Sequence, residues 1–116
     1  MRNVLFLIYN SNSFGLFEGF ARELETHCYK PLLLDLGPFK FNRKDADIET
    51  MAQKSSFRYV NYHPHSFRGD DKQYVFCEWV FDTYKFDLLV VPFEASIMQL
   101  FVMRAKELNI PTLHIQ

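Results

Sequence analysis

Two unbroken runs of apolar residues are the strongest pattern in the chain. Val4–Tyr9 and Leu88–Pro92 contain no polar side chain except the tyrosine hydroxyl. Strands of a parallel sheet that are covered on both faces have uninterrupted apolar sequences of this kind, whereas half-exposed strands alternate apolar and polar residues. The pattern predicts buried strands at Asn3–Tyr9 and Asp87–Pro92. Further strands are predicted at Lys30–Asp35, Phe57–Tyr62 and Thr112–Ile115.

Helical spacing of apolar residues occurs between these strands. It predicts helices at Phe14–Cys28, Asp45–Lys54 and Asp71–Lys85, and a fourth helix that starts near Ser96. Ser96 and Gln99 have the spacing of a capping box. At the other end of that helix, Asn109 can adopt the left-handed conformation and Pro111 prevents continuation.

The alternation of strand and helix predicts one α/β domain over residues 1–116, a length typical of a single domain. Right-handed crossovers make it a Rossmann-like, three-layer α/β/α sandwich with a five-stranded parallel sheet of order 3-2-1-4-5. In such sheets ligands bind beyond the carboxyl ends of the strands, where the winding direction reverses. We therefore expect a site between the ends of the first and fourth strands.

Composition narrows the class of protein. Hydrophobic residues make up 48% of the chain and the formal net charge is −1, with no basic block that would indicate a nucleic-acid partner. No stretch approaches the roughly 18 apolar residues of a transmembrane segment, and Val4–Tyr9 is too short for a signal peptide. We expect a cytoplasmic protein in which Cys28 and Cys77 are reduced, half-buried thiols in helices.

The predicted site contains one acidic residue, Glu94, between the fourth strand and its helix. Partial burial there could raise its pKa and suit it to general acid or base catalysis; alternatively, Glu94 only complements the positive start of the helix. The polar turn after the first strand and three residues near other strand ends are candidates for substrate binding. These candidates are Asn10, Ser11, Asn12, Ser13, His63, Ser96 and His114.

Several other functions lack their motif. Gly15 and Gly19 do not form the glycine pattern of a dinucleotide site, and no lysine next to serine or threonine indicates a phosphate loop. His63 and His65, with Asp70 and Asp71 nearby, offer metal-ligand chemistry, but Pro64 makes the two histidines point apart in an extended segment. We assign no metal site.

The carboxyl-terminal part of the chain resembles a known family. The run Phe86–Val91, then Glu94, then a helix that closes with Ala105-Lys106-Glu107-Leu108-Asn109-Ile110-Pro111 before a last strand, resembles the end of the amino-terminal domain in GT-B glycosyltransferases and the related sugar-nucleotide 2-epimerases. The first strand and its serine- and asparagine-rich turn are compatible with the same domain, although many members have a glycine-rich turn there.

The resemblance implies the acceptor-side half of a longer, two-domain glycosyltransferase that acts on a sugar or cell-surface glycan. Its nucleotide-sugar donor would bind in a carboxyl-terminal domain beyond Gln116, so this chain alone would bind no cofactor and be inactive. A different class of function stays open. The helix Asp71–Lys85 carries so many aromatic residues that it could instead be the partner-binding surface of a non-catalytic Rossmann-like interaction module.

Overall fold

The structure of the protein is a computed structural model, which describes residues 2–9, 11–40, 50, 53, 57–92 and 97–115. Side chains at 11–14, 16 and 40 are not described. Strands and helices alternate along the chain, and their bounds are β1 (Arg2–Ile8), α1 (Ser11–Thr26), β2 (Tyr29–Asp35), α2 (Gly37–Lys40), β3 (Arg58–Tyr59), the 3₁₀ turn η1 (Pro64–Ser66), α4 (Lys72–Thr83), β4 (Leu88–Val91), α5 (Ile97–Glu107) and β5 (Thr112–His114).

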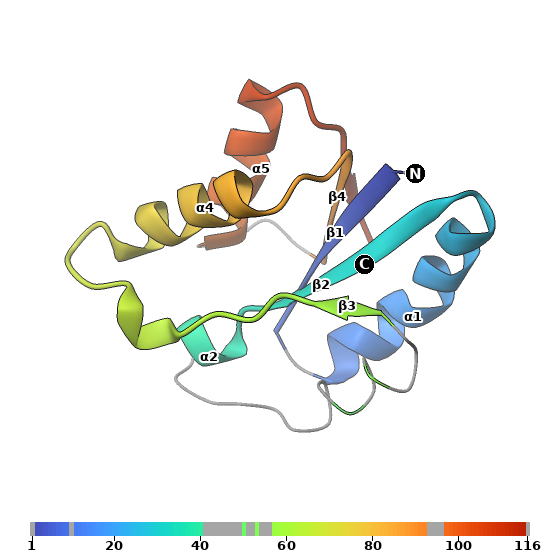
Figure 1. Cartoon of the computed structure of the whole chain (residues 1–116), viewed down its shortest axis with the longest axis horizontal. Coiled ribbons are helices and arrows are strands. Elements are labelled where there is room, and N and C mark those ends of the chain that lie inside the picture. Colours follow the sequence, from blue (N-terminus) through green and yellow to red (C-terminus); the bar gives the residue numbers. More distant parts are fainter. Residues whose placement is uncertain are drawn as a thin grey trace.

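The five strands form one parallel sheet of order β3-β2-β1-β4-β5, which confirms the predicted fold class and strand order. Helix α1 covers one face of the sheet, and α4 and α5 cover the other (Figure 1). The predicted helix Asp45–Lys54 lies largely outside the described residues. Among the described residues, no helix is long and apolar enough to cross a bilayer.

Alternate residues of β1 explain why its apolar run has no polar interruption. Leu5 and Leu7 pack in the cluster beneath α4 and α5, whereas Val4, Phe6 and Ile8 pack in the cluster beneath α1. All five side chains are fully buried. A strand in the centre of a sheet with helices on both faces has no solvent-facing side, so neither set of residues can be polar.

The edge strand β3 is much shorter than the predicted strand Phe57–Tyr62. Only Arg58 and Tyr59 pair with β2, and the N–H of Val60 adds one hydrogen bond to the carbonyl of Leu33 at 2.9 Å. Beyond this point the chain leaves the sheet and crosses its carboxyl end toward α4. Tyr62, the last residue of the predicted strand, lies in this crossing segment, where its hydroxyl donates to the carbonyl oxygen of Asp35.

One predicted helix end is confirmed and two others differ from the prediction. Asn109 has a φ of 59°, which confirms its expected left-handed conformation after α5. Helix α1 begins at Ser11 rather than at Phe14, because the first turn of a helix has free N–H groups and tolerates serine and asparagine. Cys28 lies beyond α1, exposed and with a φ of 69°, so its predicted place in a half-buried helix position is wrong.

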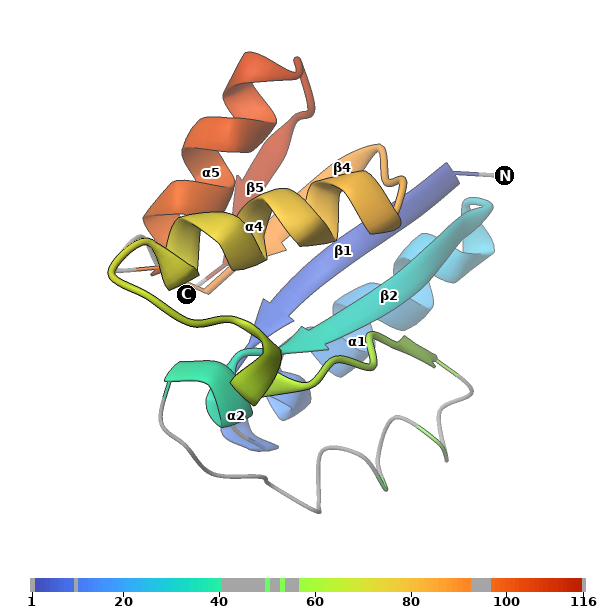
Figure 2. The same ribbon diagram turned by 60° about the vertical axis from the view of Figure 1, so that its left-hand side comes forward.

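Helices α4 and α5 pack against each other through their aromatic residues. Phe76, which is fully buried, lies 6.3 Å from Phe101 between ring centroids. At the surface, the Nε of Arg104 on α5 lies 3.0 Å from Oε1 of Glu78 on α4. The two helices thus form a single layer over the sheet, and the start of α4 reaches the end of the sheet to which the strands point (Figure 2).

Candidate functional site

The predicted site between β1 and β4 is only partly described. Asn10, Glu94 and Ser96 lie outside the described residues. Ser11, Asn12 and Ser13 form the first turn of α1 rather than a free turn before it. Their backbone is therefore at the carboxyl end of the central strand β1, as expected, and their role in substrate binding stays a prediction.

His63 and His114 are exposed and lie at opposite edges of the sheet. His114 is the last residue of β5, in register with Val91, and His63 precedes η1 on the β3 side. Four strand spacings of about 4.8 Å separate β3 from β5, or roughly 19 Å. His114 therefore lies far from β3, and the roles of His63 and His114 in substrate binding stay predictions. Among the described residues, no three His, Cys, Asp or Glu side chains are grouped for metal binding.

A buried carboxylate organises the carboxyl end of β2. Asp35 is fully buried, and its Oδ1 accepts a hydrogen bond from the N–H of Gly37 at 2.8 Å. Its Oδ2 accepts from the Tyr59 hydroxyl at 3.3 Å, and its carbonyl oxygen accepts from the Tyr62 hydroxyl at 2.5 Å. Burial raises the pKa of Tyr62, and the negative charge of Asp35 raises it further. Tyr62 is thus held as a neutral phenol that donates.

These hydrogen bonds tie three segments together at one end of the sheet. Asp35 ends β2, Gly37 begins α2, and Tyr62 belongs to the segment that crosses from β3 to α4. The result is a fixed position for α2, whose Phe39 ring stacks on Phe76 with centroids 4.4 Å apart and an interplanar angle of 15°. Phe39 therefore packs against the core.

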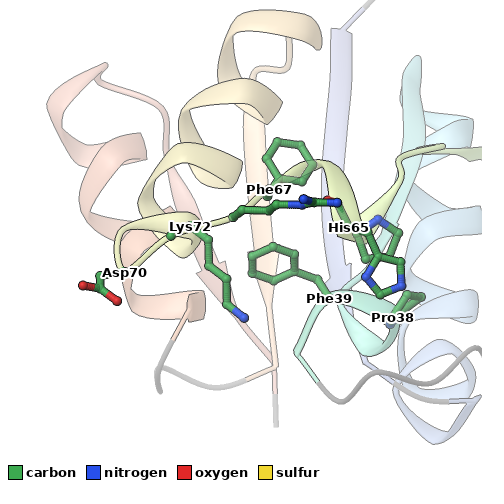
Figure 3. A pocket seen from close by; sticks show the side chains of 9 residues that line it. Pro38, Phe39, His65, Phe67, Asp70 and Lys72 are labelled. Carbon is green, nitrogen blue, oxygen red and sulfur yellow. The ribbon is translucent and has the colours of Figure 1, made fainter.

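A pocket of about 730 Å³ opens between α2, η1 and the start of α4. Its walls combine rings and prolines with charged and polar groups, shown in Figure 3. The lining residues are Pro38, Phe39, Pro64, His65, Phe67, Arg68, Gly69, Asp70 and Lys72. Phe39 and Phe67 contact each other edge to face at 6.1 Å, and both pack on the buried Phe76. The aromatic wall is therefore packed directly on the core.

The charged groups of the pocket are mostly positive. The Nε of Arg68 donates to the carbonyl oxygen of His65 at 3.0 Å, which orients the guanidinium. Within the part of the chain that the structure describes, neither Arg68 nor Lys72 forms an ion pair. Asp70 points away from the rings, whereas Lys72 extends beside Phe39 (Figure 3).

Comparison with known proteins bears on the fold. No protein-family model and no curated protein matches the sequence. A crystal structure of a glycosyltransferase from Rickettsia africae ESF-5 matches with a TM-score of 0.63 at 11% identity, over 97% of this chain and 29% of that one. The chain has a glycosyltransferase-like fold. It spans less than a third of the length of that glycosyltransferase.

Most of the residues that line this pocket were not predicted from the sequence. His65 was considered only as a metal ligand, and Arg68 and Lys72 were not considered. One signal was available: the long polar segment from His63 to Asp70 joins a strand to a helix at the carboxyl end of a parallel sheet, where ligands bind. No such signal indicated that Phe39 lines the pocket, because its position depends on a contact between distant segments.

Proposed function

We propose that this chain is the acceptor-side, amino-terminal domain of a GT-B-like glycosyltransferase and is inactive alone. The observation that carries the proposal is the pocket at the carboxyl end of the sheet in a glycosyltransferase-like fold. A volume of about 730 Å³ lies within the roughly 300–1,000 Å³ of ligand pockets. Rings such as Phe39 and Phe67 offer apolar surface for the face of a sugar, and charged groups nearby offer hydrogen bonds.

In this proposal a second domain supplies the nucleotide-sugar donor. The acceptor hydroxyl attacks the anomeric carbon of the donor and loses its proton, and the bond from that carbon to the nucleotide phosphate breaks. Glu94 is proposed as the base that takes the proton, because it follows β4, the strand beside the central strand β1. Ser11, Asn12, Ser13, Ser96 and Asn10 are proposed to bind substrate hydroxyls, with His63 and His114 at the two edges.

The alternative, a partner-binding module, needs an exposed aromatic surface on α4. The helix turns Phe76, Cys77, Val80 and Phe81 into the core, and Trp79 contacts Phe67 at 5.6 Å. Its most exposed apolar residues are Tyr74 at 59% and Val75 at 43%. Most of the aromatic content of α4 therefore serves internal packing, and we retain the carbohydrate proposal.

The test is carbohydrate binding by the isolated chain. Titration with mono- and oligosaccharides, followed by amide chemical shifts in two-dimensional NMR, should show millimolar binding, equivalent to about 4 kcal/mol. The shifted amides should belong to α2 and to residues 64–72. The absence of binding at sugar concentrations up to about 100 mM would refute an acceptor site. A dissociation constant of that size corresponds to a binding free energy of only roughly 1.4 kcal/mol. Sugar transfer from a nucleotide sugar by the chain alone would refute the requirement for a second domain.

A further inference from the structure

We infer that the pocket between α2, η1 and α4 binds an acidic sugar, whose phosphate or carboxylate is held by Arg68 and Lys72. This inference rests on the proposed function, since it names the class of acceptor. It starts from the charge of the pocket wall. Two permanent cations and one histidine line it, against a single carboxylate, although the whole chain has a formal charge of −1.

Arg68 is oriented to bind an anion. Its Nε is occupied by the carbonyl oxygen of His65 at 3.0 Å, and among the described residues no other hydrogen bond or ion pair engages its guanidinium. The two terminal nitrogens therefore stay available as donors. A planar guanidinium fixed at one nitrogen can present the remaining N–H groups to the paired oxygens of a phosphate or carboxylate.

Lys72 stands where a lysine is unfavourable for folding. It is the first residue of α4, and positive charge at a helix start opposes the helix dipole. No acidic residue lies in the first turn, and Asp71 makes no side-chain capping hydrogen bond. Within the described residues the ammonium group of Lys72 forms no ion pair, so it can bind an anion.

The remaining lining residues favour a sugar over a small inorganic anion. Phe39 and Phe67 form an apolar wall beside Lys72 (Figure 3), and the volume of about 730 Å³ far exceeds that of a lone phosphate. Asp70, the one carboxylate of the wall, points away from the rings (Figure 3). The ring of a sugar can cover the aromatic wall while its acidic group reaches the two cations.

The test compares four probes on the 116-residue chain at low salt: glucose 6-phosphate, glucuronate, glucose and inorganic phosphate. Calorimetry should show that at least one acidic sugar binds about tenfold or more tighter than both glucose and inorganic phosphate. Glucose 6-phosphate and glucuronate distinguish a phosphate from a carboxylate. Raising the salt concentration should weaken the binding of the acidic sugar but not that of glucose.

Substitutions then locate the effect. Lys72→Gln and Arg68→Gln should each weaken acidic-sugar binding about tenfold while leaving glucose binding unchanged. Lys72→Gln should keep or raise the melting temperature, since it removes a cation from a helix start. The matched control is Lys106→Gln, which removes an exposed lysine from the opposite end of the helical layer, in the last turn of α5, and should not change binding.

The outcomes separate this inference from the proposed function. If glucose binds as tightly as the acidic sugars, the inference is wrong and the carbohydrate proposal stands. If inorganic phosphate binds as tightly as glucose 6-phosphate and glucose does not bind, the pocket holds an anion without recognising a sugar, and both are wrong. Equal effects of Lys106→Gln and Lys72→Gln would also overturn the inference, because binding would then follow net charge alone.

Discussion

Replacing Asp35 with alanine should destabilise the protein more than any change at a surface carboxylate. Asp35 is fully buried at the end of β2. Its carboxylate accepts hydrogen bonds from the N–H of Gly37 at 2.8 Å and from the hydroxyl of Tyr59 at 3.3 Å. Asp35→Ala removes both acceptors, and the two donors are left without these partners.

The magnitude follows from the exposure of the two donors. A buried donor without a partner costs about 1–3 kcal/mol. The N–H of Gly37 lies in a buried hydrogen bond, whereas Tyr59 is half-buried and its hydroxyl can turn toward water. We therefore expect a loss of about 2–4 kcal/mol in the free energy of unfolding. At about 3–5 °C per kcal/mol for a domain of this size, the melting temperature should fall by roughly 6–20 °C.

Urea unfolding followed by the fluorescence of Trp79, the single tryptophan, measures this loss. Asp35→Asn keeps a side-chain oxygen for the N–H of Gly37 and should lose about half as much or less. Asp87→Ala is the matched control, because Oδ2 of Asp87 accepts the N–H of Asn3 at 3.0 Å in an exposed position. Its loss should be about 0.5–1.5 kcal/mol.

Two results would refute this reasoning. If Asp35→Ala lowers the free energy of unfolding no more than Asp87→Ala does, burial does not increase the contribution of these hydrogen bonds to stability. An Asp35→Asn loss equal to that of Asp35→Ala would show that the negative charge matters instead of the accepting oxygens. If the expected order is found, Asp35→Ala should also weaken carbohydrate binding, because α2 carries Phe39 into the pocket wall.

Three further predictions concern the core and the thiols. Phe76→Ala should cost about 3–5 kcal/mol in urea unfolding, because it removes a fully buried ring at the centre of the aromatic cluster. A disulfide thiol reagent should modify only Cys28 in the native protein at pH 8, since Cys77 is buried and burial raises its pKa to about 12. The thiol of Cys77 should also make stability fall as pH rises above its ordinary pKa of 9, because the unfolded chain then releases a proton that the folded chain keeps.

A control variant or a contradicting result tests each of the three predictions. Tyr74→Ala, at a residue 59% exposed, should change stability by no more than about 0.5 kcal/mol, and an equal loss at Phe76 would contradict the packing argument. Two rapidly reacting thiols in the native state would contradict the burial of Cys77. From pH 9 toward pH 12, the stability advantage of the native sequence over Cys77→Ala should shrink by up to about 1.4 kcal/mol per pH unit. A pH-independent difference would exclude that linkage.

The sheet could be predicted from the sequence because its signals are local. The apolar run Val4–Tyr9 requires a strand covered on both faces, and the alternation of strands with helices restricts the handedness of the connections. Asn109 and Pro111 end α5 through their own backbone preferences. Each of these features depends on residues close together in the chain, so the strand order 3-2-1-4-5 followed without knowledge of any distant contact.

The pocket could not be predicted because its walls come from distant segments. Phe39 follows β2, Phe67 follows η1, and both pack on Phe76 in α4. Nothing in the spacing of three phenylalanines among thirteen indicates which of them meet. Lys72 was equally hidden, since a lysine near a helix start looks like an ordinary surface residue until its neighbours are known.

The shortness of β3 leaves a long segment of chain at the carboxyl end of the sheet. A two-residue strand leaves residues 60–71 to cross the carboxyl end of the sheet before α4 begins on the opposite face. The hydroxyl of Tyr62, bonded to the carbonyl of Asp35, anchors this crossing segment beside α2. Phe67 of this segment then meets Phe39 of α2 edge to face, with ring centroids 6.1 Å apart. The short edge strand, which differs from the prediction, thus frees the segment that lines the pocket together with α2 and the start of α4.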